Sequence, residues 1–527
     1  MKEGVTKPLA LAIFAAAFGS SLLFGWNIGV INQPQNVMGH WIRDVKCKRL
    51  MDADAPRDDT YEKWCDKRPV ENDTIKMYPP DQAPKNEIDP GFGDVAPNPD
   101  LNALWSFIVA IFAIGGLIGA LASGWLVTKY GRKGTLMMNT GLGLIAVALL
   151  AFPYLARSYE MLFVGRFLMG VNCGINSGIP AMYFSEISPL HLRGAIGSLH
   201  QLFITIGIFL SSIFGLYPIL GSEDLWPVLF ALAVVPIIVQ LMTLPLVPES
   251  PKYLYLDKGD EAAAQRALAK FRGTEDNHEE MAEMKKESDQ IKSEPKVTIR
   301  DVFTNKFLRK VTIIAILLMV MQQFSGINAI MFYSTRIFNS CGLTAEAASY
   351  ATIGLNAVNV AMTLVSVVLV EKAGRKTLLL VGFIGMGASM VLLAVFMLQT
   401  GAGKVSETEP IVENPRKVWA APLSAVMVFL GVIFFATGPG SVPWFMISEM
   451  VPQSSRGIAT SLAVGTNWLC TFIVGQAFPP LQEALKENVF FVFASILALS
   501  ALYTWKFVPE TKGKTLEQVR AELQQTL

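Results

Sequence analysis

Twelve stretches of about 20 mostly apolar residues run through this chain of 527 residues, and each is long enough to cross a membrane as a helix. Charged residues make up only 17% of the sequence, against roughly 25% in a soluble protein. The stretches lie near residues 9–32, 102–128, 135–156, 161–185, 195–219, 226–247, 311–338, 347–370, 377–399, 422–447, 458–480 and 488–508. The sequence therefore predicts an all-α integral membrane protein with twelve transmembrane helices.

Composition excludes several other classes of protein. Lys and Arg number 44 and Asp and Glu 43, so no net charge attracts nucleic acid. Five cysteines in a chain of this length cannot form a disulfide scaffold. The Gly-x-x-x-x-Gly-Lys-Ser/Thr signature of nucleotide binding is absent from the sequence. We expect a protein that is no enzyme and that needs no cofactor or metal.

The distribution of basic residues predicts the orientation. An even number of spans puts both termini on one side of the membrane, and the short loops and tails of that side hold fourteen Lys and Arg against six on the other. Because short cytoplasmic loops carry the excess of Lys and Arg, both termini are expected in the cytoplasm.

Two long polar segments interrupt the spans. Residues 33–100 are expected outside the cell, where Asn72 of the sequon Asn72-Asp73-Thr74 is a glycosylation acceptor. An oxidising exterior would favour a disulfide between Cys47 and Cys65, and the alternative is two free thiols. Residues 248–310 hold two short amphipathic helical patterns and are expected to form a cytoplasmic linker. The predicted domains are residues 1–247, this linker, residues 311–508 and a cytoplasmic tail at 509–527.

An internal duplication divides the chain into two halves. Ser185-Glu186-x-x-Pro189-x-x-x-Arg193-Gly194 recurs 263 residues later as Ser448-Glu449-x-x-Pro452-x-x-x-Arg456-Gly457. Lys129-Tyr-Gly-Arg132-Lys133 recurs as Lys372-Ala-Gly-Arg375-Lys376, and Pro248-Glu249-Ser250 as Pro509-Glu510-Thr511. Each pair falls at a corresponding cytoplasmic helix end, which predicts two parallel six-helix repeats, an architecture of secondary transporters.

The repeated charges suggest a gate. Glu186 and Glu449 each lie seven residues before an arginine, Arg193 or Arg456, and a carboxylate near the membrane is costly unless it is paired. The Gly-Arg-Lys turns, with Arg132 and Arg375, supply further partners. We expect these groups to lock one conformation at the cytoplasmic side. The alternative is that they only anchor the loops.

Together these motifs resemble the animal facilitative hexose transporters, the GLUT family, in the sugar-porter branch of the major facilitator superfamily. Further matching motifs are Gly165-Arg166-Phe167, Pro-Glu-Ser-Pro-Lys at 248–252, Gln322-Gln323-Phe-Ser-Gly-Ile-Asn328, Gly438-Pro439-Gly440-Ser-Val-Pro443-Trp444 and Pro-Glu-Thr-Lys-Gly at 509–513. The resemblance covers nearly the whole chain except the long outer loop.

A neutral sugar needs uncharged groups that both donate and accept hydrogen bonds, and an aromatic face. The resemblance implies that a central hexose cavity is lined by Gln201, Ile204, Ile208, Gln322, Gln323, Asn328, Asn359, Trp444, Asn467 and Trp468. Without the resemblance, a hydrogen bond between helices is the favoured role for each amide taken singly. Gly438, Pro439, Gly440 and Pro443 break span 10, and Gly326 interrupts span 7. Phe332 and Tyr333 match an outer gate, and the gating set also includes Arg166.

Three positions depart from the pattern of the family: Ala436, the triplet Met319-Val320-Met321, and Thr471. They suggest a hexose range broader than glucose alone. The sequence predicts a plasma-membrane uniporter for D-glucose, and for galactose or mannose as competitors. One alternative is a proton–sugar symporter, which needs a buried group that titrates; Asn27 stands where proton-driven relatives carry an aspartate, and His200 is the remaining candidate. The other alternative is a sugar sensor that transports nothing.

Overall fold

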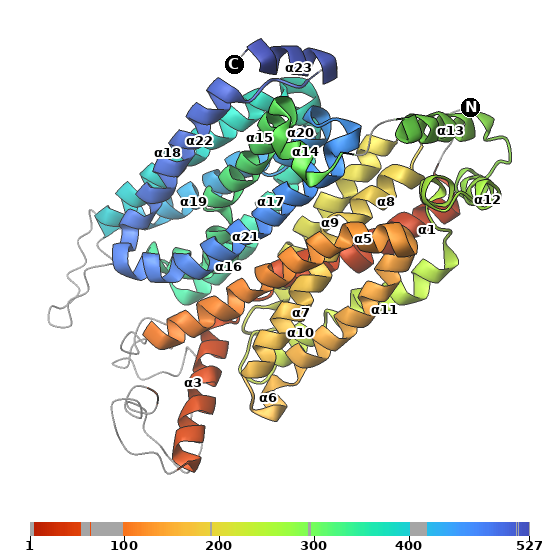
Figure 1. The fold of residues 1–527 in the computed structure, drawn as a ribbon. Helices are drawn as coiled ribbons and strands as arrows, with labels where there is room; N and C mark the ends of the chain where they lie inside the picture. The colour runs from red at the N-terminus through yellow and green to blue at the C-terminus, as the bar shows by residue number, and fades with distance from the viewer. Residues whose placement is uncertain are drawn as a thin grey trace.

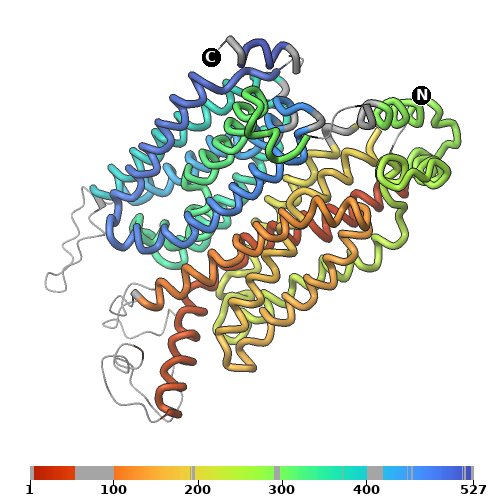
Figure 2. The backbone as a smooth tube through the Cα atoms, in the orientation of Figure 1, coloured from red at the N-terminus to blue at the C-terminus, as the bar shows by residue number. Residues whose placement is uncertain are grey.

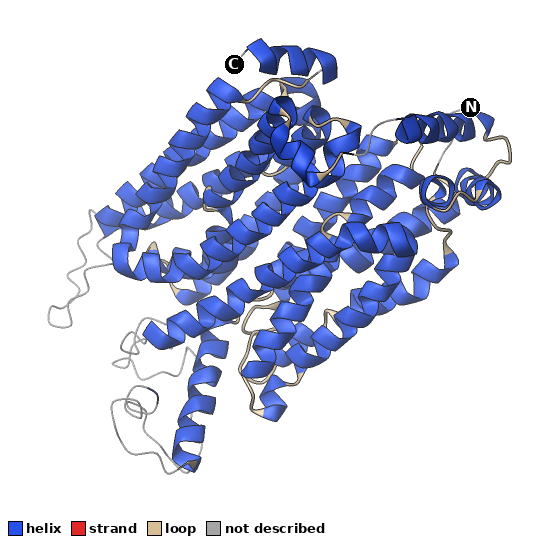
Figure 3. Ribbon diagram, in the orientation of Figure 1, coloured by secondary structure: helices blue, strands red, loops and turns tan. Residues whose placement is uncertain are grey.

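The computed structural model describes residues 5–53, 64, 99–189, 192–293, 297–400, 419–512, 514 and 516–525. The regular secondary structure in these residues is helical (Figure 3). The first half contains α1 (Lys7–Ala16), the π-helix η1 (Ala17–Leu22), α2 (Leu23–Gly29), α3 (Gln35–Asp52), α5 (Pro99–Ala151), α6 (Pro153–Ala156), α7 (Glu160–Asn176), α8 (Ile179–Ile187), α9 (Arg193–Phe214), α10 (Trp226–Ala231), α11 (Val234–Thr243) and η2 (Leu244–Leu246). The connecting segment contains η3 (Tyr253–Asp257), α12 (Glu261–Arg272), α13 (His278–Ser293) and α14 (Ile299–Thr304). The second half contains α15 (Lys306–Phe324), α16 (Ile327–Ser340), α17 (Ala345–Ala373), α18 (Arg375–Thr400), α19 (Ala420–Thr437), α20 (Val442–Met450), α21 (Gln453–Leu485), η5 (Lys486–Asn488) and α22 (Val489–Phe507), and the tail forms α23 (Leu516–Gln525).

Nine helices in the described residues are long and apolar enough to cross a membrane. Two of them, Asp100–Ala151 and Ser455–Phe507, are 52 and 53 residues long, and each contains two of the predicted spans. The predicted span 161–185, which contains most of α7 and of α8, is not among the nine. The difference between nine and twelve therefore comes from this span and from two pairs of spans joined end to end.

The helices form two groups that lie side by side (Figures 1 and 2). The group from α1 to α11 makes one half, and the group from α15 to α22 makes the other. Both chain termini lie at the same end of the molecule, which we name the terminal end; α12, α13 and α23 lie there too. The opposite end, from which α3 projects, is named the far end.

Two glycines explain how the spans of each half turn at the terminal end. Gly131 has φ +81° and Gly374 has φ +89°, a region that residues with a side chain rarely adopt. A Cβ on Gly131 would lie 2.3 Å from Glu249 Oε2, and a Cβ on Gly374 would lie 2.7 Å from Glu510 Oε2. Both turns therefore need glycine, because the backbone has a positive φ and a carboxylate fills the place of a side chain.

Hydrogen bonds join the two halves near the far end. Asn32 Nδ2 donates to the Met331 carbonyl at 2.9 Å and to Ser334 Oγ at 2.5 Å. Gln33 Nε2 donates to the Ser349 carbonyl at 3.1 Å, and Asn356 Nδ2 donates to Ser212 Oγ at 2.6 Å. These contacts hold the first half against α16 and α17 at the far end.

The two helices predicted in the connecting segment are confirmed as α12 and α13, and α12 docks on the first half. Arg272 at the end of α12 donates to the Ile187 carbonyl at 2.7 Å and pairs with Glu280 at 2.8 Å. Thr6 caps α1 and donates to the Phe271 carbonyl at 2.6 Å. The start of α1 and the end of α8 are thus both hydrogen-bonded to α12.

Candidate functional site

Four amides predicted to bind sugar are bonded to one another in the second half. Asn328 Nδ2 donates to Gln323 Oε1, and Gln323 Nε2 donates to Asn467 Oδ1 at 2.8 Å. Asn467 Nδ2 donates in turn to Gln322 Oε1 at 2.8 Å. The four residues are named the amide chain below. It crosses the break between α15 and α16, where Gly326 has φ +89°.

The amide chain ends on the break between α19 and α20. Gln322 Nε2 donates to the carbonyl of Pro439 at 2.7 Å and to that of Gly440 at 2.8 Å. On the other side of the break, Cβ atoms built on Gly438 and Gly382 would lie 2.1 Å from the Leu378 carbonyl and from Pro439 Cδ. The break is therefore packed tightly against α18 and hydrogen-bonded to α15.

Two of the three departures from the family pattern touch the amide chain. Met319 Sδ accepts a hydrogen bond from Asn467 Nδ2 at 3.3 Å. Thr471 Oγ1 accepts from Asn328 Nδ2 at 3.2 Å and donates to the Asn467 carbonyl at 2.9 Å. Ala436 is buried in α19 and offers no polar group.

The other predicted sugar residues lie apart from this chain of bonds. Asn359 is 8% exposed, and its side chain makes no hydrogen bond to the described residues. Ile204 and Ile208 are buried where α9 packs against Gly25 and Gly29 of α2. Gln201 is exposed on the same helix, nearer the terminal end.

The two predicted tryptophans differ in their surroundings. Trp444 is 37% exposed in α20. Trp468 is 5% exposed, because Phe24 and Phe112 of the first half lie 5.7 and 5.9 Å from it, ring centroid to ring centroid. Trp468 therefore belongs to the contact between the halves in this conformation.

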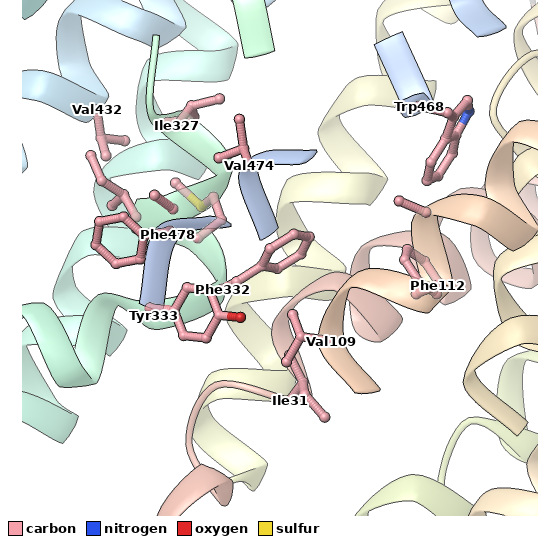
Figure 4. Close-up of a cluster of buried hydrophobic side chains, with 14 of the residues drawn as sticks. Ile31, Val109, Phe112, Ile327, Phe332, Tyr333, Val432, Trp468, Val474 and Phe478 are labelled. Atoms are coloured by element: carbon pink, nitrogen blue, oxygen red, sulfur yellow. The ribbon is translucent and has the colours of Figure 1, made fainter. Parts of the chain in front are cut away.

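The two aromatic residues predicted to form an outer gate, Phe332 and Tyr333, pack against neighbouring helices near the far end. Tyr333 has φ −131° and ψ 21°, which kinks α16, and its hydroxyl donates to the Gly475 carbonyl at 2.9 Å. Its ring stacks on Phe478 with 5.6 Å between centroids. Figure 4 shows Phe332 directed from α16 towards Val109 of the first half. These side chains fill the space between α16, α21 and α5.

The first half also contains a broken span, between α7 and α8. Pro180 lies at the start of α8, 263 residues before Pro443, and it removes a backbone N–H from the helix. The Ser177 carbonyl in the break accepts from His200 Nε2 at 3.0 Å, and Ser21 Oγ lies 2.7 Å from His200 Nδ1. A carbonyl can only accept, so Nε2 carries the proton and Nδ1 accepts from Ser21 in the neutral ring. His200 thus joins η1, α9 and the broken helix.

Arg166 is a fully buried charge in the first half. Its Nη1 donates to the Asn27 carbonyl at 2.9 Å, and its guanidinium lies 4.4 Å from the Phe112 ring centroid. Its Nε and Nη2 have no hydrogen-bond partner in the described part of the chain, where Arg166 forms no ion pair either. Asn27 Nδ2 donates to the Leu23 carbonyl, so an amide occupies the position next to this charge.

At the terminal end of the first half, the repeated motifs meet in one network. Arg132 pairs with Glu186 and with Asp257, both at 2.8 Å. The second oxygen of Glu186 accepts from Ser250 Oγ, and Glu249 accepts from the backbone N–H groups of residues 132, 133 and 134. The anion therefore lies at the start of a helical segment, where exposed N–H groups stabilise it.

The second half repeats this network. Arg375 pairs with Glu449 at 2.8 Å, and Thr511 Oγ1 donates to Glu449. Glu510 accepts from the backbone N–H groups of residues 375, 376 and 512. Burial raises the pKa of Glu510, but these N–H donors outweigh it, and the pKa lies below the ordinary value of a glutamate.

The predicted pair Glu449–Arg456 needs correction. Arg456 donates to the Val451 carbonyl of its own loop, at 3.3 and 3.4 Å, and Glu449 is bonded to Arg375 instead. Glu186 is bonded to Arg132, and the side chain of Arg193 is outside the described residues. In both halves, folding brings the arginine at the start of the preceding span, Arg132 or Arg375 of a Gly-Arg-Lys turn, to the carboxylate. Each network joins helices within one half.

In the polar loop, Cys47 is disulfide-bonded. Its predicted partner Cys65 and the predicted glycosylation site Asn72 lie outside the described residues. The predictions for those two residues remain as the sequence states them.

Sequence reasoning missed several buried polar contacts. Asn139, Asn172 and Asn176 bond to one another between α5 and α7, and Gln240 Nε2 donates to Ser20 Oγ at 2.7 Å. Their signal was the same as that of the amide chain, an amide inside an apolar span. The contacts of Asn32 and Gln33 with the second half had no signal, because these residues lie at the end of the predicted span 9–32 and at the start of the polar segment that follows it.

The sequence matches the family model "Sugar (and other) transporter" over residues 12–523. It is 41% identical over 524 residues to "Facilitated glucose transporter protein 1" of Caenorhabditis elegans, covering 99% of this chain and 91% of that protein. It is 38% identical over 522 residues to "Solute carrier family 2, facilitated glucose transporter member 2" of Mus musculus, covering 99% and 95%.

Solved structures of sugar transporters have a similar fold. The partially occluded inward open conformation of the xylose transporter XylE from E. coli superposes with a TM-score of 0.72 at 25% identity, covering 97% of this chain and all of that chain. The proton:xylose symporter XylE bound to 6-bromo-6-deoxy-D-glucose gives a TM-score of 0.68 at 26% identity, covering 98% of both. The fold is that of the major facilitator superfamily, in a multi-pass membrane protein that is a transporter and no enzyme. The chain therefore belongs to the sugar transporter family of the major facilitator superfamily.

Proposed function

We propose that this chain carries D-glucose and related hexoses passively across the plasma membrane, as a uniporter that works by alternating access. The observation that carries the proposal is the amide chain: four uncharged side chains, partly bonded to backbone carbonyls, in the core of the second half. Amides both donate and accept, which suits hydroxyl groups. Relatives named as facilitated glucose transporters support glucose as the substrate.

The conformation described above represents one stage of this cycle. The far end is held shut by Asn32, Gln33 and the aromatic gate, whereas Gln201 and Trp444 are exposed. With both termini in the cytoplasm, as the basic residues of the loops predict, this is a conformation that faces inward. Sugar would then leave towards the cytoplasm past Trp444.

Proton coupling requires a membrane-embedded group that gains and loses a proton during the cycle. Asn27 cannot titrate near neutral pH, and Arg166 stays protonated. His200 is bonded at both ring nitrogens, to Ser21 and to the Ser177 carbonyl, which supports a structural role for the ring. These three environments favour a uniporter over a symporter.

The substrate range follows from the departures near the amide chain. Met319 and Thr471 take bonds from Asn467 and Asn328 where the family pattern has other residues, and Ala436 leaves room near the break. Galactose and mannose are expected to compete with D-glucose. Strict rejection of both in a competition assay would show that these departures do not affect selection.

Uptake of radiolabelled D-glucose into proteoliposomes tests the function, with L-glucose as the control for leakage. Uptake should stop when the internal and external concentrations are equal, with or without an imposed pH gradient. Accumulation above equality that collapses with a protonophore would show a symporter. The absence of D-glucose uptake by folded, purified protein would favour a sensor.

A further inference from the structure

The break between α19 and α20 leaves two backbone carbonyls without their helical partners. The Pro439 carbonyl would accept from residue 443 in a continuous helix, but Pro443 has no N–H. The Gly440 carbonyl would accept from the Trp444 N–H, which instead donates to the Ser441 carbonyl at 3.2 Å. Unpaired carbonyls in a membrane interior are costly, so both need a donor from elsewhere.

One side chain supplies both donors. Gln322 Nε2 donates to these two carbonyls, at 2.7 and 2.8 Å, and Gln322 is only 3% exposed. An amide nitrogen has two hydrogens, and both are used here. A sugar hydroxyl can therefore accept from Gln322 only if one of the bonds to the break is given up.

We propose that Gln322 is a positioning residue that couples sugar binding to the break between α19 and α20: the sugar and the two carbonyls compete for one amide. Without sugar, Gln322 holds the break in the conformation described here. When a hydroxyl takes one of its hydrogens, the break loses that bond and α20 is freed to move over the sugar. The inference rests on the proposed role of the amide chain as the hexose site.

The rest of the amide chain extends the same coupling to α16. Asn328 reaches Gln323 across Gly326, so the bonds run from one broken span to the other. Asn467 accepts from Gln323 and donates to Gln322, with no spare hydrogen after its bond to Met319. A change at Gln322 therefore shifts the hydrogen bonds available at Asn467.

Restoring a backbone donor at residue 443 tests the competition. Pro443→Ala gives the Pro439 carbonyl a partner within the helix, which leaves one Gln322 hydrogen free for sugar. The half-saturation concentration for D-glucose should fall by about two- to ten-fold, the factor that one hydrogen bond supplies, and the maximal exchange rate should also fall. Pro443→Ser restores the same donor and serves if the alanine variant does not fold.

A double-mutant cycle with Gln322→Ala decides whether the effect passes through Gln322. In that background, Pro443→Ala should leave the half-saturation unchanged. An equal change in both backgrounds would overturn the inference. Pro180→Ala is the matched control, since its effect should not depend on Gln322. If the wild-type protein neither binds nor transports D-glucose, the proposed function fails; if it transports and the cycle is additive, only the coupling fails.

Discussion

Each half of the molecule contains a span that is broken at a corresponding position, near Pro180 in the first half and near Pro443 in the second, and different side chains donate to the carbonyls of the two breaks. At the break between α7 and α8, the Ser177 carbonyl is bonded by His200, whose other nitrogen is occupied by Ser21. At the break between α19 and α20, the carbonyls of Pro439 and Gly440 are bonded by Gln322, which also belongs to the amide chain. The two halves therefore share the position of the break and differ in the side chain that donates to its carbonyls.

The donors suggest different roles for the two breaks. His200 bonds only to protein groups, so it holds the first break whatever the sugar does. Gln322 has a second use in the proposed sugar site, so the second break responds to substrate. The first half then acts as a more rigid partner, on which the second half changes shape.

The charged networks at the terminal end also differ between the halves, in how deeply their side chains are buried. Changes in these networks give the largest expected loss of unfolding free energy. The side chains of Arg132 and Glu186 are 12% and 10% exposed, whereas those of Arg375 and Glu449 are 18% and 29% exposed. Arg132→Ala leaves a nearly buried carboxylate unpaired, which costs about 3–5 kcal/mol of unfolding free energy. Arg375→Ala should cost less than half of that. Thermal unfolding in detergent measures both, and equal losses would mean that the halves are equally dependent on their networks.

Removing the donor at the first break should reduce stability without changing affinity. His200→Ala leaves the Ser177 carbonyl unsatisfied and is expected to cost about 1–3 kcal/mol of unfolding free energy. The half-saturation for D-glucose should change less than two-fold. His200→Asn, which can still donate and accept, should recover part of the stability. A large loss of affinity in His200→Ala would place the ring in the sugar path.

Removing the donor at the second break should reduce affinity. Gln322→Ala deletes a proposed sugar contact, and the half-saturation for D-glucose should rise by about ten-fold, equivalent to roughly 1.4 kcal/mol. Gln240→Ala is the matched control, since it removes a buried amide that bonds Ser20 in the first half. Transport kinetics of both variants give the comparison. Unchanged half-saturation in Gln322→Ala would remove this residue from the sugar site.

The smallest expected effect concerns the pH dependence at Glu510. Its pKa in the folded protein lies below the ordinary value, so its contribution to stability is present above the unfolded value of about 4.3 and is lost as the pH falls towards the folded pKa. Glu510→Gln should lower stability at pH 7 by less than about 1 kcal/mol, since the group is partly exposed. As the pH falls through the folded pKa of Glu510, the stabilities of the variant and the wild-type protein should converge, as followed by thermal unfolding across pH. A constant difference would mean that its ionisation contributes nothing.

The sequence predicted the spans and the repeat well because both depend on local patterns. Apolar stretches marked the helices, and the offset of 263 residues aligned Glu186 with Glu449. The break at Ser177 was missed because a single Pro180 near the end of the predicted span 161–185 is compatible with a continuous kinked span.

The sequence also identified the amides of the second half, but not their arrangement. Gln322 and Gln323 are adjacent in an apolar span. The local sequence does not indicate that Gln322 donates to the Pro439 carbonyl and that Gln323 donates to Asn467. The pair Glu449–Arg456 was misassigned for the same reason, because Glu449 is bonded to Arg375, which is 74 residues away in sequence. Contacts between distant segments depend on the packing of the spans, which patterns along the chain do not contain.

The most direct test of the unequal breaks is a pair of spin-label distances measured with and without sugar. One pair joins Gly457, near the start of α21, which follows α20, to Phe507 at the end of α22; the other joins Gly197, near the start of α9, which follows α8, to Leu246 at the end of η2. A Cβ at either glycine meets nothing within 4 Å, so labels there disturb little. D-glucose, but not L-glucose, should shift the Gly457–Phe507 distance and leave Gly197–Leu246 unchanged, and the shift should be lost in Gln322→Ala. Equal shifts in both halves, or a shift that persists in Gln322→Ala, would contradict the account.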